Sequence, residues 1–258
     1  MVILRSRDNP RVKRWARLSR DTRFRRKERR ALLEGPNLVA ALLDRRWKPI
    51  CVIVSESAAR DPEIQGLLGK AKMECVELSD SVFNSTVDTE TPQGIAAEIE
   101  IPEGRKDPQG SCIFLEGIQD AGNVGAIIRS AAAFGVVSVV LDSACADPWS
   151  PKVLRAGMGG HFRVSIESAT SLEREFETFA GRLLCTVARG GVGLAEADLS
   201  GRLGWVFGSE GKGVSAQALK EADLKITVPT APGTESLNVA AAAAICLYAS
   251  FSRPAAGS

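Results

Sequence analysis

Three short segments in the second half of the chain combine glycines with amide, carboxylate, hydroxyl and guanidinium side chains that could bind and orient a ligand. Each segment lies next to an apolar run of strand type, where a turn or a helix would begin. The carboxyl ends of parallel strands gather at one edge of an α/β sheet, and ligands bind there. The segments are Asn123-Val124-Gly125-Ala126-Ile127-Ile128-Arg129, Gly208-Ser209-Glu210-Gly211-Lys212-Gly213 and Val228-Pro229-Thr230-Ala231-Pro232-Gly233-Thr234-Glu235-Ser236-Leu237-Asn238.

The glycines of the second segment indicate a tight turn at the end of a strand. Glycine tolerates backbone torsion angles that other residues resist, so such a turn can approach a ligand closely. The spacing of Gly208, Gly211 and Gly213 matches neither the GxGxxG dinucleotide fingerprint nor a phosphate-binding P-loop, because no Ser or Thr follows Lys212. An ordinary turn is the alternative interpretation.

Together and in this order, the three segments resemble the signature motifs of the SpoU, or TrmH-like, RNA ribose 2′-O-methyltransferases of the SPOUT superfamily. The resemblance implies an enzyme that transfers a methyl group from S-adenosylmethionine to a ribose 2′-hydroxyl, and a homodimer. It also implies a mainly parallel α/β domain whose C-terminal segment threads a deep trefoil knot, a rare arrangement in proteins. The expected cofactor-binding residues are Gly208, Gly211, Val228, Pro229, Leu237 and Asn238, and the expected catalytic residues are Asn123, Arg129, Glu210, Ser236 and Asn238.

Methyl transfer to a 2′-hydroxyl is an in-line displacement that needs positioning, fixed dipoles and the removal of one weakly acidic proton, with no metal required. In the family, the motif arginine, here Arg129, is assigned to the reacting hydroxyl, sometimes as its general base. A guanidinium has a pKa above about 12 and loses its proton with great difficulty. We therefore expect Arg129 to clamp a phosphate and to stabilise the developing alkoxide, and we leave the base unassigned.

Each of these residues also has a purely structural interpretation. Arg129 could be a cation on a helix surface, and Glu210 could be a solvated acid. Ser236 could cap the last helix, which is expected to start after residues 234–236, and Asn238 could hold the loop. Their places within matched motifs favour the functional roles.

The N-terminal segment is strongly basic. Residues 1–50 hold 16 Lys or Arg against five acidic residues, whereas the rest of the chain has more acidic than basic residues. A local excess of positive charge of this size favours a polyanionic partner. Because the release of counterions from phosphates contributes much of the affinity for nucleic acids, RNA is the natural candidate. A solvated basic helix without a partner is the alternative. The expected RNA-binding residues are Arg11, Lys13, Arg14, Arg23, Arg25, Arg26 and Arg30.

Two α/β domains are expected, at residues 1–101 and 111–258, joined by a linker at 102–110 that combines turn formers and charges. In the first, the pattern is helical from Pro10 to Ala41, and a further helix starts at Pro36. Its expected strands lie at 50–54, 75–78 and 94–101. In the second, strands near 112–117, 136–141, 162–166, 183–187, 204–207 and 224–228 alternate with helices, which predicts a mainly parallel sheet covered on both faces.

The first domain carries a resemblance of its own. Two of its segments are similar to the start of the substrate-binding domain that precedes many SpoU catalytic domains, a fold similar to ribosomal protein L30e. These segments are Ser6-Arg7-Asp8-Asn9-Pro10-Arg11-Val12-Lys13 and Leu32-Leu33-Glu34-Gly35. With the C-terminal motifs, the family pattern covers nearly the whole chain.

Metal, disulfide and membrane roles are not expected. The six cysteines lie at least 24 positions apart, mostly in apolar runs, which indicates buried thiols in a reduced cytosol. His161 is the only histidine and is expected to be structural, because nothing near it in sequence completes an acid–base set. The N-terminus has no signal-peptide pattern and the longest apolar run, residues 239–249, is too short to cross a bilayer.

The sequence therefore predicts a cytoplasmic RNA 2′-O-methyltransferase that acts on ribosomal RNA, with transfer RNA as the second choice. One rival is a non-catalytic RNA-binding or ribosome-assembly protein that retains the fold and does not bind S-adenosylmethionine. Another is a nucleotide-dependent oxidoreductase on a Rossmann sheet. That class requires an early glycine fingerprint, whereas the first strand of the second domain leads into Asp120-Ala121-Gly122-Asn123.

Overall fold

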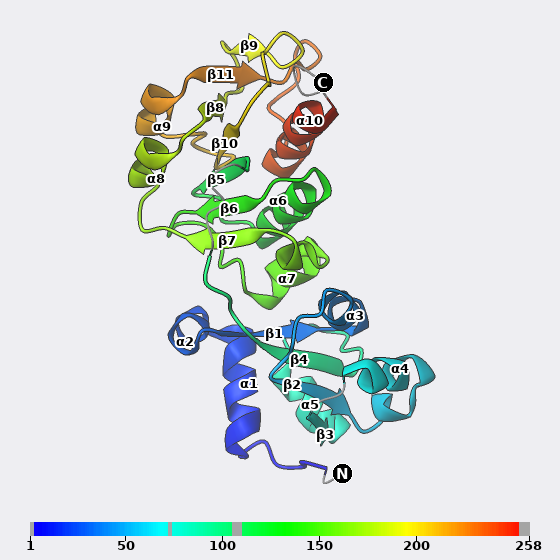
Figure 1. Cartoon of the computed structure of the whole chain (residues 1–258). Coiled ribbons are helices and arrows are strands. Elements are labelled where there is room, and N and C mark those ends of the chain that lie inside the picture. The colour runs from blue at the N-terminus through cyan, green and yellow to red at the C-terminus, as the bar shows by residue number, and fades with distance from the viewer. Residues whose placement is uncertain (1–2, 72–73, 105–109, 253–258) are drawn as a thin grey trace. The chain divides into compact units, whose positions relative to one another are not determined.

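The computed structural model describes residues 3–71, 74–104 and 110–252 (Figure 1). Within these ranges the chain forms two compact units. The first consists of Met1–Pro102 and Asp147–Phe162, and the second of Glu103–Ala146 and Arg163–Ser258. Residues 147–162 therefore pack with the first unit, although the sequence analysis placed them in the second domain. Of the expected linker, residues 105–109 lie outside the described residues.

The first unit contains a four-stranded mixed sheet with helices around it. Its strands are β1 (Arg30–Glu34), β2 (Cys51–Ser55), β3 (Cys75–Leu78) and β4 (Ile95–Glu100). Its helices are α1 (Pro10–Arg20), α2 (Thr22–Glu28), α3 (Pro36–Asp44), α4 (Pro62–Ala71), α5 (Asp80–Thr86) and α7 (Pro151–Gly157), with 3₁₀ turns at Ala58–Arg60 and Gly160–Phe162. The strand order is β1-β4-β2-β3; β4 is antiparallel to both its neighbours, and β2 and β3 are parallel. The three strands expected in this unit are confirmed.

α1 begins at Pro10, where the Asn9 side chain accepts a hydrogen bond of 2.9 Å from a first-turn N–H. Proline suits this position because the N–H that it lacks would have no partner within the helix. Val12, Trp15 and Leu18 lie on one face of the helix and are at most 2% exposed. The narrow apolar stripe expected from the sequence therefore packs into the core of the first unit.

The expectation that the helical pattern continues to Ala41 is wrong. α2 ends at Glu28, its C-cap Arg29 adopts a left-handed conformation with a φ of 52°, and the chain then forms β1. β1 pairs in antiparallel register with β4, with Arg30 opposite Glu100. A short apolar run is compatible with a helix or a strand, so the distant partner strand decides its conformation.

The second unit is built on a seven-stranded parallel sheet. Its strands are β5 (Cys112–Glu116), β6 (Ser138–Leu141), β7 (Ser165–Ser168), β8 (Arg182–Thr186), β9 (Val192–Gly193), β10 (Leu203–Gly208) and β11 (Leu224–Thr227). Its helices are α6 (Ala121–Ala133), α8 (Glu173–Thr178), α9 (Ala216–Glu221) and α10 (Val239–Ser252). The strand order is β7-β6-β5-β10-β8-β11-β9, and every neighbouring pair is parallel. Figure 1 shows α6 and α10 on one face and α8 and α9 on the other.

This architecture confirms the α/β class and the parallel sheet, while the trefoil knot stays a prediction. Two details differ from the expected strands. Phe162 closes a 3₁₀ turn and β7 starts later, at Ser165, and the short strand β9 was not expected. No helix within the described ranges is long and apolar enough to span a bilayer.

The strand order places the ends of four strands at one edge of the sheet, because β5, β10, β8 and β11 are neighbours and parallel. After β5, the Asp120 carboxylate accepts a hydrogen bond of 2.8 Å from the Asn123 N–H and so caps α6. β10 ends at Gly208, and β11 runs directly into Val228. The three motifs therefore all leave the sheet at this edge.

Candidate active site

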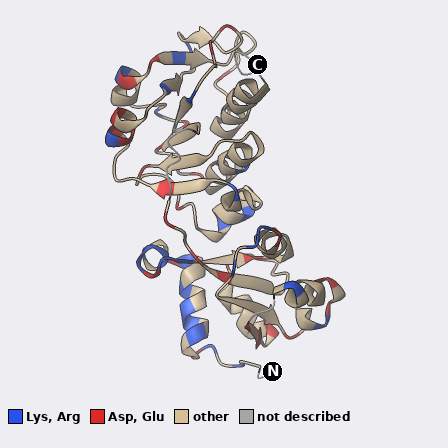
Figure 2. Ribbon diagram, viewed as in Figure 1, with Lys and Arg blue, Asp and Glu red and all other residues tan. Residues whose placement is uncertain are grey.

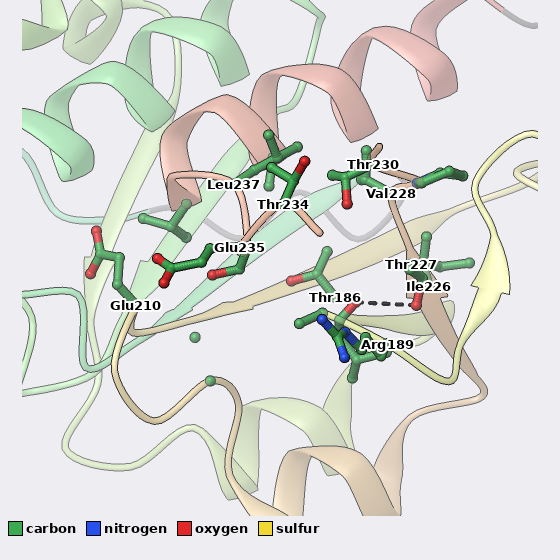
Figure 3. A pocket seen from close by; sticks show the side chains of 18 of the residues that line it. Thr186, Arg189, Glu210, Ile226, Thr227, Val228, Thr230, Thr234, Glu235 and Leu237 are labelled. Atoms are coloured by element: carbon green, nitrogen blue, oxygen red, sulfur yellow. Dashed lines mark hydrogen bonds between the residues drawn. The ribbon is translucent and has the colours of Figure 1, made fainter. Parts of the chain in front are cut away.

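A cavity of about 890 Å³ lies at the carboxyl ends of β8, β10 and β11 (Figure 3). Its volume is typical of small-molecule sites. The cavity is lined by residues 186–190, 208–213 and 226–237, together with Val239 and Ala242. All the expected cofactor-binding residues except Asn238 therefore line it, as do Glu210 and Ser236 of the expected catalytic set.

The turn after β10 folds back on its own strand. The Gly213 N–H donates to the Ser209 carbonyl at 2.8 Å, and Gly213 has a φ of 68°. A Cβ on Gly208 would lie 2.1 Å from the Gly213 carbonyl, whereas a Cβ on Gly211 would have no atom within 4 Å. Gly208 is therefore required by the turn itself. Gly213 has open space but needs its positive φ, whereas Gly211 has open space and no positive φ.

Asn238, and not the segment before it, caps the last helix. Its Oδ1 accepts hydrogen bonds from the N–H groups of Ala240 at 3.0 Å and Ala241 at 3.2 Å. α10 accordingly starts at Val239, later than expected. Ser236 is exposed and lines the cavity, so its hydroxyl is available to a ligand.

A chain of hydrogen bonds joins one residue of each motif. The Asn238 Nδ2 donates to the Asn123 Oδ1 at 3.0 Å, and the Asn123 Nδ2 donates to the Glu210 carboxylate. Because both ends of the Asn123 amide are engaged, its orientation is defined. The tertiary structure thus brings together three residues that are far apart in the sequence.

Arg129 is the one expected catalytic residue that lies apart from this group. It is exposed on α6, six positions after Asn123, and it does not line the cavity. With about 100° of rotation per helical residue, six positions place it about 120° around the helix from Asn123. Within a single chain, therefore, Arg129 does not complete the cavity.

The loop after β8, residues 186–190, is the part of the lining that the sequence analysis missed. It contributes Arg189 to the cavity. The Thr227 hydroxyl holds the loop, because it donates to the Val187 carbonyl at 3.2 Å and accepts from the Gly191 N–H at 3.0 Å. The loop has no recognisable motif, and only the position of β8 between β10 and β11 shows that it reaches this edge.

Figure 2 shows Lys and Arg concentrated on α1 and α2 of the first unit. Of the expected RNA-binding residues in this unit, all except Arg23 and Arg26 form ion pairs within the protein. Arg11 contacts Glu74 at 2.7 Å, and Lys13 contacts Asp8 at 2.8 Å. Two of the expected RNA-binding residues are different, because Arg23 and Arg26 on α2 are exposed and their side chains have no hydrogen bond or ion pair within the part of the chain that the structure describes. Arg23 and Arg26 are therefore free to contact a polyanion.

Arg25 was expected to bind RNA, but the structure places it inside the protein. Its side chain is only 3% exposed and pairs with Asp147 at 2.7 Å. Its Nη1 also donates to the Leu18 carbonyl at 2.7 Å. A guanidinium enclosed in this way cannot reach a phosphate, so Arg25 instead ties residues 147–162 to the first unit.

Arg14 and Arg30 also bind within the protein. Both contact Glu98, which is completely buried on β4, at 2.7 Å and 2.9 Å. The Trp15 Nε1 donates to the same carboxylate at 2.7 Å. The two arginine side chains remain 28% and 34% exposed, but their charge is balanced by a buried acid. Glu98 therefore organises this part of the first unit.

The single histidine is enclosed in the first unit. The His161 Nε2 lies 2.8 Å from the Pro148 carbonyl, and its ring lies against Trp149 with centroids 5.4 Å apart. Burial lowers the pKa of His161 to about 4, so the ring is neutral at physiological pH. Its Nδ1 is buried without a partner in the described residues. These contacts agree with the expected structural role.

The cysteines are free thiols, and all except Cys75 are buried. Burial raises the pKa of Cys51, Cys145, Cys185 and Cys246 to about 12, so these thiols are protonated at neutral pH. In residues 3–71, 74–104 and 110–252 there is no cluster of three His, Cys, Asp or Glu side chains that could hold a metal ion.

Comparisons with known proteins match both parts of the chain. Residues 110–248 match the SpoU rRNA Methylase family, and residues 9–97 match the MRM3-like substrate binding domain. The chain is 32% identical to the 23S rRNA (guanosine(2553)-2′-O)-methyltransferase RlmP of Bacillus subtilis, and the match covers 96% of this chain and 98% of that relative.

Solved structures extend the likeness to the complete fold. An AdoMet-bound rRNA methyltransferase from Sinorhizobium meliloti has a TM-score of 0.83 and 26% identity over 96% of this chain and 97% of its own. An RNA methyltransferase of the TrmH family from Porphyromonas gingivalis has a TM-score of 0.81 and 30% identity over 94% and 97% of the two chains. Since the family match at residues 110–248 covers more than half of the chain and all three motifs, and the relatives align along nearly the full chain, this protein belongs to the SpoU rRNA methylase family.

Proposed function

We propose that this protein transfers the methyl group of S-adenosylmethionine to a ribose 2′-hydroxyl of ribosomal RNA. The observation that carries the proposal is the chain of hydrogen bonds from Asn238 through Asn123 to Glu210, beside a cavity that two of the three motifs line. The Bacillus subtilis relative is named as a 23S rRNA 2′-O-methyltransferase, which supports ribosomal RNA over transfer RNA. The cytoplasmic location stays a prediction.

The cavity fits S-adenosylmethionine in charge as well as in size. The cofactor carries a carboxylate, an ammonium and a sulfonium group. The lining offers both signs of charge, because Arg189 and Lys212 are cations and Glu210 and Glu235 are anions (Figure 3). Opposite charges around a cavity favour a ligand that carries both signs.

The main-chain groups of Gly208, Val228 and Leu237 would hold the adenosyl part, as the family resemblance implies. All three line the cavity. The open space at Gly211 supports a close approach of the ligand, because nothing in the protein itself occupies the position of a side chain there.

Bound S-adenosylmethionine supplies a methyl group activated by a positive sulfur, so the protein has to position the acceptor and manage one proton. Asn123 is fixed by Glu210 on one side and by Asn238 on the other. Asn238 is in turn fixed by the first turn of α10. This rigid polar group beside the cavity provides dipoles that need no rearrangement during the reaction.

Arg129 would act on the RNA and not on the methyl donor, because it is exposed and lies outside the cavity lining. Its guanidinium can clamp a phosphate next to the reacting ribose and stabilise the alkoxide that develops there. The proton acceptor stays unassigned. The hydroxyl of Ser236 is exposed in the cavity and is proposed to contact the cofactor or the acceptor.

We also propose a homodimer formed through α10. Ile245, Tyr248 and Phe251 of this helix are 41%, 59% and 62% exposed. The rings of Tyr248 and Phe251 both contact Phe134, at the end of α6. Such exposed apolar groups mark interfaces, and the family resemblance implies that a second copy covers them.

Light scattering tests the dimer. It should give twice the chain mass for the wild type and one chain mass for the Tyr248→Glu/Phe251→Glu variant. A monomeric wild type would contradict this proposal.

Methyl transfer from radiolabelled S-adenosylmethionine tests the proposed reaction directly. Wild-type protein should label ribosomal RNA more than transfer RNA, with the label at a 2′-oxygen. Asn123→Ala should lower the transfer rate by about 100-fold, the usual effect of losing one positioned polar group, while cofactor affinity stays within a few-fold. Asn84→Ala, which removes an exposed amide of the first unit, serves as the control. Binding of RNA without binding of S-adenosylmethionine would favour a non-catalytic RNA-binding protein.

A further inference from the structure

We propose that a second cavity, in the first unit, holds an unstacked base of the RNA substrate. The cavity has a volume of about 530 Å³ and lies where β1 meets α3, beside residues 87–95 and Arg155 of α7. All its lining residues belong to the first unit, and none is among the expected RNA-binding residues. The inference depends on the proposed function only in taking RNA as the ligand.

The buried part of the lining is apolar. Phe83, Val87 and Ile95 are each at most 3% exposed, and Pro92 adds a further apolar wall. RNA-binding proteins place bases that have left the stack against aromatic and apolar side chains, since the faces of a base are poorly hydrated. The inner surface of this cavity is therefore suited to the face of a base.

The outer part of the lining is polar but uncharged. Thr91 and Gln93 are exposed and Thr89 is half-buried. Hydroxyl and amide groups both donate and accept hydrogen bonds, and a base edge presents both donors and acceptors. The Gln93 Oε1 lies 3.1 Å from the position that a Cβ of Gly35 would occupy, and Gly35 has a φ of 96°. A glycine at this position therefore leaves room for the amide at the mouth of the cavity.

The wall between β1 and residues 88–89 is rigid. The Glu34 side chain is 2% exposed and pairs with Arg155 at 2.8 Å. The same carboxylate accepts hydrogen bonds from the N–H groups of Asp88 at 2.8 Å and Thr89 at 3.3 Å. Burial raises the pKa of Glu34, and the amides and the guanidinium oppose that effect. This wall of the cavity is thus held in place before any ligand arrives.

The charges of the cavity favour a neutral group over a phosphate. Arg155 is the only cation among the lining residues, and it is paired with both Glu34 and Asp88. The two carboxylates offset the positive charge of this guanidinium, so the cavity attracts a further anion only weakly. The cavity therefore selects the base and not the phosphate of a nucleotide.

Such a pocket would supply sequence selectivity, which the basic helices α1 and α2 lack. Phosphate contacts position a protein on RNA but carry no sequence information, whereas base contacts do. In the first unit, most of the expected RNA-binding cations are engaged in internal pairs, and Arg23 and Arg26 provide only charge. Recognition of one extruded base would add selectivity to that charge.

A salt series separates the two kinds of contact. The Gln93→Leu variant removes the amide at nearly constant side-chain volume, and its affinity for ribosomal RNA should fall about five- to tenfold at every salt concentration. The slope of affinity against salt should stay as in the wild type, because no phosphate contact is lost. The matched control, Asn84→Leu, removes an exposed amide on α5 outside the cavity and should bind as the wild type does.

Unchanged RNA affinity in Gln93→Leu, or a loss equal to that of Asn84→Leu, would overturn the proposal. A changed salt slope would also overturn it, since it would indicate a phosphate contact. The melting temperature and the affinity for S-adenosylmethionine report separately on folding and on the other unit. If wild-type protein transfers methyl groups and Gln93→Leu binds RNA normally, the base pocket is wrong and the proposed function stands; if the wild type transfers none, the proposed function is wrong whatever Gln93→Leu does.

Discussion

The two units use their polar side chains in opposite ways. In the first unit, Glu98, Glu34 and Arg25 are buried and fully paired, so they connect strands, helices and the 147–162 segment. In the second unit, Glu210 and Asn238 are exposed and Asn123 is half-buried, at the end of an otherwise apolar parallel sheet. Their hydrogen bonds hold a group beside a cavity and do not hold the core together.

This difference shows that charge alone is a poor guide to a binding site. A basic segment can look like an RNA surface and still contain arginines that are needed inside the protein. The end of a parallel strand is a more reliable indication, because the geometry of the sheet brings such ends together whatever the composition.

The largest effect is expected from breaking the buried network of the first unit. Glu98→Leu would leave two partly buried guanidinium groups and the Trp15 Nε1 without their shared acceptor. Loss of a buried partner of this kind costs about 3 to 5 kcal/mol of unfolding free energy, which urea denaturation measures. Glu100→Leu, at the exposed end of the same strand, is the control and should change the unfolding free energy by less than about 0.5 kcal/mol. Equal losses in the two variants would mean that the network contributes nothing.

The next effect is a pH dependence that arises in the first unit. Burial lowers the pKa of His161 to about 4 from an ordinary value of 6.5, so the unfolded chain binds more protons than the folded chain between these values. Stability should therefore be complete above pH 6.5 and should fall as the pH drops towards 4, by up to about 3 kcal/mol. The unfolding free energy at pH 7 and pH 5 should differ less in His161→Gln than in the wild type. The same difference in both proteins would contradict this assignment.

A smaller effect is expected from the glycine turn of the second unit. Gly208→Ala places a Cβ about 2 Å from backbone atoms and should lower stability by about 1 to 3 kcal/mol, with loss of S-adenosylmethionine binding. Gly211→Ala has open space and should keep the wild-type melting temperature. Because folding is unchanged, a loss of S-adenosylmethionine affinity in Gly211→Ala, measured by calorimetry, would come from a clash between the new methyl group and the cofactor. Wild-type affinity in that variant would show that the cofactor does not approach Gly211.

The smallest effect on stability, and the sharpest on RNA binding, is expected on α2. Arg26→Ala should leave the unfolding free energy within about 0.5 kcal/mol and lower the slope of log affinity against log salt by about one, as for one lost phosphate contact. Its neighbour Arg25→Ala should instead destabilise the first unit, because Asp147 loses its buried partner. A slope that does not change in Arg26→Ala would mean that α2 does not face the RNA.

Much of the fold followed from the sequence because periodicity and turn residues are local signals. Most strands of the second unit, the start of α1 at Pro10 and the apolar stripe of Val12, Trp15 and Leu18 depend on neighbours within a few positions, whereas the short strand β9 was missed. β1 did not follow, because its apolar run becomes a strand only through pairing with β4. The packing of residues 147–162 with the first unit was not predictable either, since it involves contacts between residues far apart in the sequence, such as Arg25 with Asp147 and Arg155 with Glu34.

The candidate active site likewise has a part that local sequence signals predict and a part that depends on long-range contacts. The order and the residue types of the three motifs, read from the sequence alone, indicated which loops carry the chemistry. Only the tertiary structure showed that Asn123 bridges Glu210 and Asn238, that the β8 loop adds Arg189, and that Arg129 stands apart. The physical reason is that a motif determines local backbone geometry, whereas the neighbours of a side chain depend on strand order and on which charges the fold has buried.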